Sequence, residues 1–404
     1  MSRQTSSEDL WAAHDAELRD PRQIAAQWTW DAEADPKLLE HEVQGRWWEV
    51  LASTGCTLLA TREYEHLVVA LGAAGGRPRQ SHLRLPHPSG LAVREDGHVC
   101  IASTRNPNIV YELAPCQSLL PQWKGLDPRR HLGTLLPARC AYLPGCLYLH
   151  DLALIGGRLH GNAVGLNAVV ELDVPGGFQV AWWPRAENQR GPRLDGNYLQ
   201  LNSIAAGQSL NTSYFSASAA APSRRRPGHR NFPVDRRGVI FSGKTRRICA
   251  SGLTRPHSAR LRGGELWVDN SGYGEVGRVS GEGFEPVARL AGWTRGLCFH
   301  EDVVFVGTSR VIPRFECYAP GVDPECSRTG IHALDVRTGQ ILGSLLWPRG
   351  NQIFALELVP STLVTGFPFS GGGRPGVRQV RALFFAGTPH PAEKPTRPRR
   401  RAES

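Results

Sequence analysis

The stretch RPHSARLRGGELWVDN, residues 255–270, begins like a β-strand whose first positions are polar. Pro256 is followed by His257 and Ser258, and a Gly-Gly pair then separates this strand from the apolar run ELWV. A strand that packs into a core would begin with an apolar side chain, so this start indicates a strand whose first residues face water. Five further stretches repeat the pattern: PSGLAV from residue 88, LHDLAL from 149, LNSIAA from 201, TRGLCF from 294 and NQIFAL from 351.

The six polar starts fall at residues 89, 150, 202, 257, 295 and 352, with spacings of 61, 52, 55, 38 and 57 residues. After each start, a Gly or Asp turn leads to a second strand that ends in small or polar residues. An approximate repeat of this length, with about four strands in each unit, is typical of a β-propeller. The sequence therefore predicts an all-β, six-bladed β-propeller. Seven blades and a β-sandwich with long connections are the alternatives.

The composition agrees with many short strands. Glycine and proline together number 74 of 404 residues, about 18%, against a typical share of roughly 12%. Extended apolar runs alternate with turn residues from about residue 46 onward, and no 15-residue window has helical periodicity. Strands near residues 53–71 and 379–386 lie outside the six units, so we expect the two chain ends to share a blade and close the ring.

Three segments are predicted. Residues 1–45 form an N-terminal extension that packs through Trp11, Trp28 and Trp30, residues 46–388 form the propeller with a basic insertion at about 220–247, and residues 389–404 form a disordered basic tail. The net charge of +10 lies in the basic insertion and the basic tail. Residues 223–247 carry +8 and residues 389–404 carry +3, which leaves −1 for the rest of the chain. Basic segments of this kind are commonly solvated, and an anionic partner is the alternative. A nucleic-acid partner is not expected, because the charge does not form a stripe.

The nine cysteines form no CxxC pair, and most lie within apolar runs, although Cys317 and Cys326 bracket one loop and could reach each other. Free thiols are typical of a reducing compartment. Neither a signal peptide nor a run of 18 apolar residues is present. We therefore expect a cytoplasmic protein with no membrane association. The arginine-rich, methionine-poor composition suggests a high-GC bacterial gene.

The strand starts define a candidate site. The first strand of each propeller blade lines the central channel, so its leading residue lies near one mouth of that channel. The predicted ring is Ser89, His150, Asn202, His257, Arg295 and Gln352. Flanking residues are Asp151, Ser203, Ser258 and Asn351, and His87 and the ends of the second strands add His160, Asn162, Asn167, Asn270, Ser309 and Arg310.

The residue types in this ring suggest roles. His150, His257 and Arg295 are the catalytic candidates, and the two histidines would act either as ligands of one divalent ion such as zinc or as acid and base. Ordinary hydrogen-bonding histidines are the alternative, and a third metal ligand could be His87, His160 or Asp151. Arg295 would hold a carboxylate or a developing oxyanion. The predicted substrate-binding residues are Asn162, Asn202, Asn270, Arg310 and Gln352.

Some of these polar residues have a structural alternative. Asn270 could make a tight turn, and Arg310 could pair with an acidic neighbour. Asp173 and Asp335 fit the turns of outer blade hairpins and are excluded from the site. No nucleophile elbow, phosphate-cradling loop or dinucleotide fingerprint is present.

Seven stretches resemble a bacterial family of conserved hypothetical β-propeller proteins of unknown function. They are CTLLATREYEHLVVAL, LHDLALIGGRLHGNA, AWWP, LNSIAA, RPHSARLRGGELWVDNSGYGEVG, TRGLCFHEDVVFVGTSR and GIHALDVRTG, and they cover roughly residues 46–360 in order. The family carries Asn-Glu-Ile where this chain has Asn351, Gln352 and Ile353, so an amide replaces a carboxylate here. More remotely, the ring is similar to gluconolactonase-like hydrolases and to amidating lyases that hold zinc with histidines from separate blades.

These observations predict an enzyme that binds a small polar or anionic metabolite, or a peptide-derived substrate, in the channel mouth. Lyase, hydrolase or isomerase chemistry, with or without a metal ion, would fit the residues. The competing hypothesis is a non-catalytic ligand-binding or interaction scaffold that uses the basic insertion as its contact. An enzyme should have a deep polar pocket with both histidines near one atom, and a scaffold should have a plugged channel and an exposed apolar patch.

Overall fold

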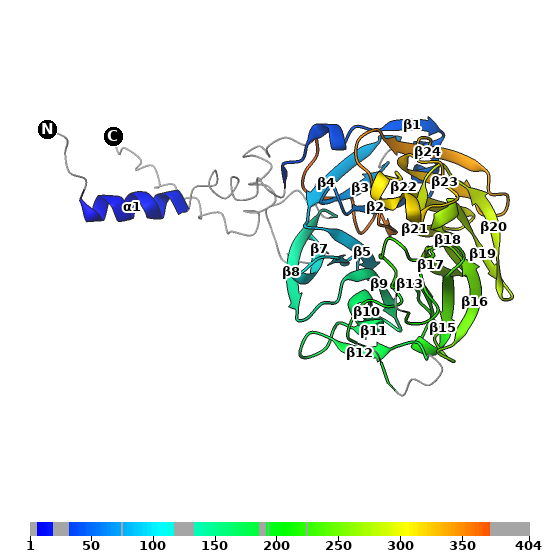
Figure 1. Cartoon of the computed structure of the whole chain (residues 1–404). Helices are drawn as coiled ribbons and strands as arrows, with labels where there is room; N and C mark the ends of the chain where they lie inside the picture. Colours follow the sequence, from blue (N-terminus) through cyan, green and yellow to red (C-terminus); the bar gives the residue numbers. More distant parts are fainter. Residues whose placement is uncertain are drawn as a thin grey trace, which may run out of the picture.

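Six β-sheets are arranged as blades around a central axis in a computed structural model (Figure 1). The structure describes residues 6–18, 32–73, 76–116, 133–185, 191–192, 194–223 and 225–371. Five of the sheets have four strands and one has five. The prediction of a six-bladed propeller is confirmed. The predicted strand at 379–386 and the tail at 389–404 lie outside the described residues.

Each blade is an antiparallel meander that runs from the axis outward. In order, the blades are β25 (Ala355–Pro360), β2 (Cys56–Arg62), β3 (Leu67–Gly72) and β4 (Arg79–Arg84); β5 (Pro88–Val93), β6 (Val99–Ser103), β7 (Asn108–Pro115) and β8 (Leu135–Leu143); β9 (Leu149–Ile155), β10 (Arg158–Ala163), β11 (Ala168–Glu171) and β12 (Gln179–Trp182); β13 (Leu201–Ala205), β14 (Tyr214–Ala217), β15 (Gly238–Ser242) and β16 (Ile248–Leu253); β17 (Pro256–Arg262), β18 (Glu265–Asn270), β19 (Glu275–Ser280) and β20 (Gly283–Arg289); and β21 (Trp293–His300), β22 (Val303–Ser309), β23 (Thr329–Asp335), β24 (Ile341–Trp347) and β1 (Glu42–Gly45).

Local turn chemistry accounts for the inner hairpins. Gly263 and Gly264 join β17 to β18 with φ of +56° and +86°. Gly156 and Gly157 join β9 to β10 with φ of +58° and +79°. Two-residue hairpin turns with positive φ at both positions match the twist of the flanking strands, and glycine adopts that conformation at little cost.

The ring closes through strands from both ends of the described chain. Inner strand β25 pairs along its length with β2, from Cys56 opposite Pro360 to Thr61 opposite Ala355. The stretch TLVTGFPFS, residues 362–370, follows β25 but forms no named strand. The N-terminal run CTLLATR supplies the second strand instead, because its seven residues are almost entirely apolar or β-branched and are buried.

The N-terminal segment joins the propeller before residue 46. Strand β1 pairs with the outer strand β24, and helix α4 (Trp47–Ser53) follows it directly. Trp47 is fully buried, and its ring meets Phe305 edge-on at 5.6 Å. Trp11, in helix α1 (Ser7–Leu18), is 71% exposed, which does not support the predicted packing through this side chain. Trp28 and Trp30 lie outside the described residues.

Apolar side chains fill the spaces between neighbouring blades. One cluster joins Leu58 of β2 to Phe305 and Leu345 of the last blade, and similar clusters lie between the other blades. The channel itself contains charge. Arg260 of β17 bonds the carboxylate of Asp151 at 3.0 Å and that of Glu357 at 3.3 Å. Burial raises the pKa of Glu357 to about 7, and Arg260 opposes that rise. This cluster links the inner strands of three blades that are not neighbours.

The cysteines and the helices bear on two further expectations from the sequence. All nine cysteines are free, and Cys317 and Cys326 are both exposed. No helix in the described ranges has the length and apolar character needed to cross a membrane.

Candidate functional site

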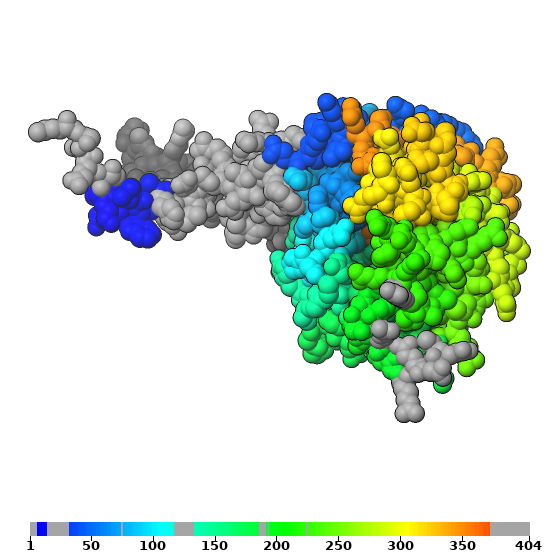
Figure 2. Space-filling model, viewed as in Figure 1, coloured from blue at the N-terminus to red at the C-terminus, as the bar shows by residue number. Residues whose placement is uncertain are grey.

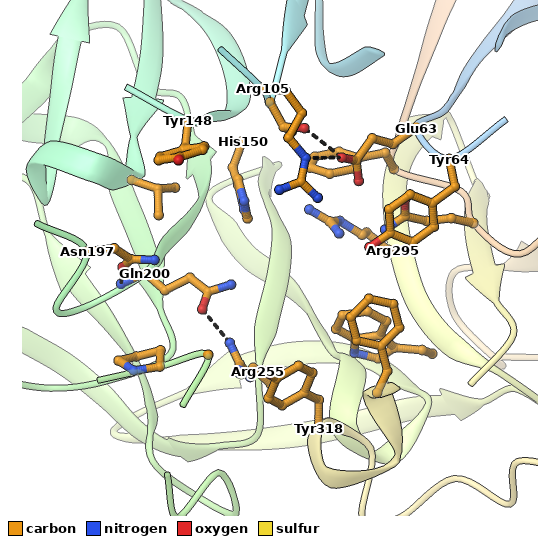
Figure 3. Close-up of a pocket in the computed structure, with 18 of the residues that line it drawn as sticks. Glu63, Tyr64, Arg105, Tyr148, His150, Asn197, Gln200, Arg255, Arg295 and Tyr318 are labelled. Carbon is orange, nitrogen blue, oxygen red and sulfur yellow. Dashed lines mark hydrogen bonds and ion pairs between the residues drawn. The ribbon is translucent and has the colours of Figure 1, made fainter. Parts of the chain in front are cut away.

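A cavity of about 500 Å³ opens where the inner strands begin, and all six blades contribute residues to it (Figure 3). Its lining is Glu63, Tyr64, Thr104, Arg105, Tyr148, His150, Val164, Asn197, Gln200, Arg226, Pro227, Gly228, His229, Arg255, Trp293, Arg295, Phe315, Tyr318, Gln352 and Phe354. Three of the predicted site residues, His150, Arg295 and Gln352, are brought together here. The volume falls in the range of small-molecule sites.

Polar residues just inside the strand starts bond neighbouring blades together. Asp151 accepts the backbone N–H of Ile204 at 2.9 Å, and Ser203 accepts that of Ala259 at 2.8 Å. Ser258 accepts the N–H of Gly296 at 2.7 Å. A register shift interrupts the pairing beside Ser203 and beside Ser258, and such a bulge re-aims a side chain. These residues, which the sequence analysis placed beside the site, therefore hold adjacent inner strands in place.

A serine-to-alanine change tests this structural role. Ser203→Ala removes the acceptor of the Ala259 N–H in a buried position, and an unsatisfied buried donor costs about 1–3 kcal/mol. We expect the free energy of unfolding in urea to fall by that amount. Ser53→Ala, at an exposed helix end, should change it by less than about 0.5 kcal/mol. Equal effects at both positions would contradict the role.

A second set of hydrogen bonds shows which residues are equivalent around the ring. A side chain of one blade donates to a carbonyl at the start of the next inner strand, at 2.6–3.1 Å: Thr61 to Ser89, Ser89 to Leu149, Asn202 to Pro256, Ser271 to Thr294 and Ser309 to Ile353. The residues after these carbonyls are Gly90, His150, His257, Arg295 and Phe354. The equivalent residues in the blades of Ser89 and Gln352 are thus Gly90 and Phe354. Ser89 lies one residue before Gly90, and Gln352 lies two residues before Phe354. Ser89 bonds a neighbouring blade and lies outside the pocket lining.

Arg295 lies at the base of the pocket and is only 4% exposed. Its guanidinium lies 3.3 Å from the centre of the Phe354 ring. Burial lowers the pKa of Arg295 to about 10, with Glu63 acting in the opposite sense, so the group remains charged at neutral pH. Its Nη2 has no hydrogen-bond partner among the described residues.

Gln352 joins Arg295 to the one acidic residue of the lining. With its amide oriented to suit its neighbours, Gln352 donates to Glu63 Oε2 at 2.9 Å and accepts from Arg295 Nη1 at 3.3 Å. Glu63 also accepts from Thr104 at 2.7 Å and lies 3.6 Å from Arg105. The Glu63 carboxylate therefore has partners in Thr104, Arg105 and Gln352, and it contacts Arg295 through the Gln352 amide.

His150 lies in the pocket wall between Tyr148 and Arg105 (Figure 3), with its ring edge-on to Phe354 at 5.5 Å. Burial lowers the pKa of His150 well below its ordinary value, and Arg295, Arg255 and Arg105 lower it further. The imidazole is therefore neutral at pH 7. Its Nδ1 has no partner in the described chain.

Arg255 is a pocket residue that sequence reasoning missed. It precedes β17 with φ of +53° and is 2% exposed. Nη1 donates to Gln200 Oε1 at 2.5 Å, and the Tyr318 ring lies 4.0 Å from the guanidinium carbon. Nε and Nη2 have no acceptor in the described part of the chain. Burial lowers the pKa of Arg255 to about 10. Arg255 is the first residue of the stretch RPHSARL, but the predicted ring of site residues takes His257, two residues later, from this blade.

Two segments outside the inner strands complete the pocket. Residues 226–229, within the predicted basic insertion, contribute Arg226 and His229 to the lining. The 3₁₀ helix η6 (Pro313–Tyr318) contributes Phe315 and Tyr318. In Figure 2 the yellow part of the chain, which includes this helix, lies at the front of the molecule. The predicted insertion at 220–247 includes β15, so the irregular part ends at residue 237. A prediction based on the repeated strands does not detect segments such as these, because they lie between the strands and do not recur in each blade.

His257 occupies a different environment from His150. It is 2% exposed, and its ring packs edge-on against Trp293 at 5.4 Å. Its Nδ1 lies 2.8 Å from the Arg255 carbonyl and 3.0 Å from the Ser271 hydroxyl. His257 is absent from the pocket lining. The structure therefore does not place His257 with His150 and Arg295 in the lining, and the His257 ring contacts the backbone carbonyl of Arg255 instead.

The residues present do not fit a metal ion. Within the described ranges no three His, Cys, Asp or Glu side chains come together as ligands. Of the suggested third ligands, Asp151 is bonded to Arg260, and His160 Nδ1 lies 2.9 Å from the Arg158 carbonyl. Three arginines act on His150, and their charge repels a cation. The predicted zinc site at His150 and His257 is thus not supported.

The other predicted substrate-binding residues lie outside the pocket lining. Asn202 bonds Ser218 and the Pro256 carbonyl, so it links two blades. Asn270 accepts from the Thr254 N–H and donates to Glu275, as expected for a turn residue. Asn162 is fully buried, and Arg310 is exposed beyond the end of β22. The pattern of polar strand ends identified these residues, but blade-to-blade bonding accounts for it at Asn202.

Comparisons with known proteins agree with the sequence resemblance. A family model described as Domain of unknown function (DUF4915) matches residues 45–366. No curated protein sequence matches the chain.

Solved structures are similar at low identity. A chain from a nidogen/laminin complex is 10% identical, with a TM-score of 0.49 over 76% of this chain and 99% of that one. A virginiamycin B lyase from Staphylococcus aureus is 14% identical, with a TM-score of 0.38 over 71% and 76%. A gluconolactonase from Xanthomonas campestris is 14% identical, with a TM-score of 0.42 over 65% and 77%.

Proposed function

The chain belongs to the family described as Domain of unknown function (DUF4915), and we propose that it is an enzyme acting on a small anionic metabolite bound in the channel mouth. The proposal rests on one observation above all: two buried arginines line the pocket with N–H donors that no described residue accepts. Buried donors are nearly always satisfied, so an unsatisfied cationic pair calls for a partner. Carboxylate and phosphate oxygens match the planar donor set of arginine.

The charge of the lining supports an anionic ligand. Four arginines face one glutamate, which leaves a net charge of +3 over the residues that line the cavity. Arg105 is engaged by Glu63, so Arg226, Arg255 and Arg295 carry the excess. Aromatic rings contribute the apolar part of the wall. A ligand with an acidic group and a flat or apolar body would be complementary to both.

His150 is placed to move a proton on such a ligand. A neutral imidazole can accept a proton from a carbon next to a carbonyl or carboxylate group. The electron pair left on carbon then moves to the adjacent oxygen, whose negative charge Arg295 stabilises. The proton returns at the same or another position, or a leaving group departs. This is the first step of many isomerase and lyase reactions, and His150 and Arg295 supply its base and its charge stabilisation.

The scaffold hypothesis expects a shallow or plugged channel and an exposed apolar patch. Large exposed apolar side chains lie on separate elements, for example Trp11 in α1, Tyr142 in β8 and Ile248 in β16. The pocket favours the enzyme.

Binding of simple monoacids tests the anion pocket. We expect calorimetry to detect saturable 1:1 binding of benzoate or butyrate, and Arg295→Gln to weaken it by about 10-fold or more, because a charged hydrogen bond is lost. Arg337→Gln removes the same charge from a side chain that is 73% exposed and lies outside the lining, and it should change affinity by less than about twofold. Equal losses in the two variants would refute the pocket, and so would a failure of these monoacids and of their diacid analogues to bind.

The pH profile tests the state of His150. Its pKa lies well below 6.5 in the free protein, so the base stays neutral, and activity should stay level from about pH 8 down to 6.5 and fall only at lower pH. Arg295→Gln removes the charge that contributes most to this depression after burial, so the residual activity should fall at higher pH than in the native protein. The measurement is the rate at which the protons next to the carbonyl of a bound 2-oxo acid exchange for deuterium in D₂O, followed as a function of pH. A native profile that falls above pH 6.5 would contradict this account.

A further inference from the structure

Arg255 presents a pair of free donors with a defined geometry. Gln200 occupies Nη1, and Nε and Nη2 have no acceptor in the described ranges. These two N–H groups lie on the same edge of the guanidinium plane and point in parallel. That edge binds two oxygens of one carboxylate or phosphate group at once. The Tyr318 ring covers the guanidinium face, which leaves the edge as the remaining contact.

Arg255 and Arg295 belong to different parts of the pocket. Arg295 lies with Glu63 and Arg105 at one side, and Arg255 lies with Gln200 at the other (Figure 3). Both arginines act on the pKa of His150, so His150 is within electrostatic range of each. No acidic residue of the lining is bonded to Arg255. The Arg255 side therefore has its own uncompensated charge.

Aromatic rings lie along the wall next to these two arginines. Trp293 and Phe315 have ring centres 5.6 Å apart, and Phe315 and Tyr318 have centres 5.8 Å apart. Tyr318 contacts Arg255, and Trp293 lies 5.9 Å from the Arg295 guanidinium. This row offers an apolar surface to the middle of a ligand whose ends reach the two arginines.

We propose that the ligand carries two acidic groups. The edge of the Arg255 guanidinium binds one of them. Arg295, beside His150, binds the second acidic group or the carbonyl group next to it. The inference rests on the proposed function and adds its substrate class, a dicarboxylate or a phosphorylated carboxylate. Arg255 binds the remote acid group and takes no part in the chemistry. It sets which substrates are accepted, and Arg295 and His150 act on the reacting end.

Matched ligands test this directly. Calorimetry compares benzoate with isophthalate and 3-phosphonobenzoate, and butyrate with glutarate. The second acid group should strengthen binding by about 10- to 100-fold, the range for added charged hydrogen bonds. The larger gain, from carboxylate or from phosphonate, identifies the natural group. Arg255→Gln should return the diacids to the affinity of their monoacids, and Arg337→Gln, at a side chain that is 73% exposed, should keep the gain within about twofold.

A second variant keeps the arginine and neutralises it. Gln200→Glu places a carboxylate on Arg255 and should abolish the gain as well, so the test holds even where Arg255→Gln fails to fold. Monoacid binding without any gain from a second acid overturns this inference and leaves the proposed function standing. A gain that persists in both variants also overturns it. Failure of monoacids and diacids alike overturns the proposed function itself.

Discussion

Replacing His150 by glutamine is expected to slow proton exchange between water and a bound 2-oxo acid by about 10²- to 10⁴-fold, the usual contribution of a general base. Glutamine keeps polarity and approximate size but cannot accept a proton from carbon. Arg255 and Arg295 remain in place, so ligand affinity should change by less than about threefold. The measurement is the loss of the proton signals next to the carbonyl of 2-oxoglutarate and pyruvate in D₂O, followed by NMR.

His257→Gln is the matched control for that experiment. His257 is buried behind Arg255 and lies outside the pocket lining. Its replacement should lower the free energy of unfolding but keep exchange within about tenfold of the native rate. An equal fall in the exchange rate in the two variants would indicate that His257 is also catalytic. An exchange rate in His150→Gln equal to that of the native protein would show that His150 is not the base.

Replacing Arg260 by methionine is expected to lower the free energy of unfolding by about 3–5 kcal/mol, because it leaves the buried Asp151 carboxylate and the partly exposed Glu357 carboxylate without their partner. Asp151 and Glu357 both bond Arg260 inside the channel. Methionine retains much of the apolar stem, so most of the loss comes from charge and not from packing. Urea unfolding at about pH 7.5 measures it.

Two further variants define the cause. Arg260→Met combined with Glu357→Gln removes one of the two unpaired carboxylates and should recover part of the loss. Arg337→Met, at a side chain that is 73% exposed, should change stability by less than about 0.5 kcal/mol. A loss below about 1 kcal/mol in Arg260→Met would mean that the channel cluster contributes little to the fold.

Sequence reasoning found the blades because each inner strand repeats the same physical requirement. Its first residues must be polar to bond the next blade, and its later residues must be apolar to pack. That is why starts near His150, Asn202 and Arg295 coincide with β9, β13 and β21. Closure was harder to predict. Thr61 of β2 and Ala355 of β25 are 294 residues apart in the chain, and only the apolar, β-branched composition of the two strands marks them as partners.

The site was only partly predictable for the same reason. Polar residues at strand starts serve two purposes, and the repeat does not separate them. His150 and Arg295 face the pocket, but Asn202 bonds a neighbouring blade. Arg255 precedes the strand, and Tyr318 comes from a segment between β22 and β23. Neither position belongs to the repeating unit, so their proximity follows only from the folded chain.

The most direct test of the anion pocket is a crystal structure of the protein with 4-bromobenzoate, in which anomalous scattering locates the bromine. The account predicts the ligand in the channel mouth, with its carboxylate on Arg255 or Arg295 and its ring against the aromatic wall. An empty pocket at a ligand concentration that saturates binding in solution, with bromine only at other surfaces, would contradict it.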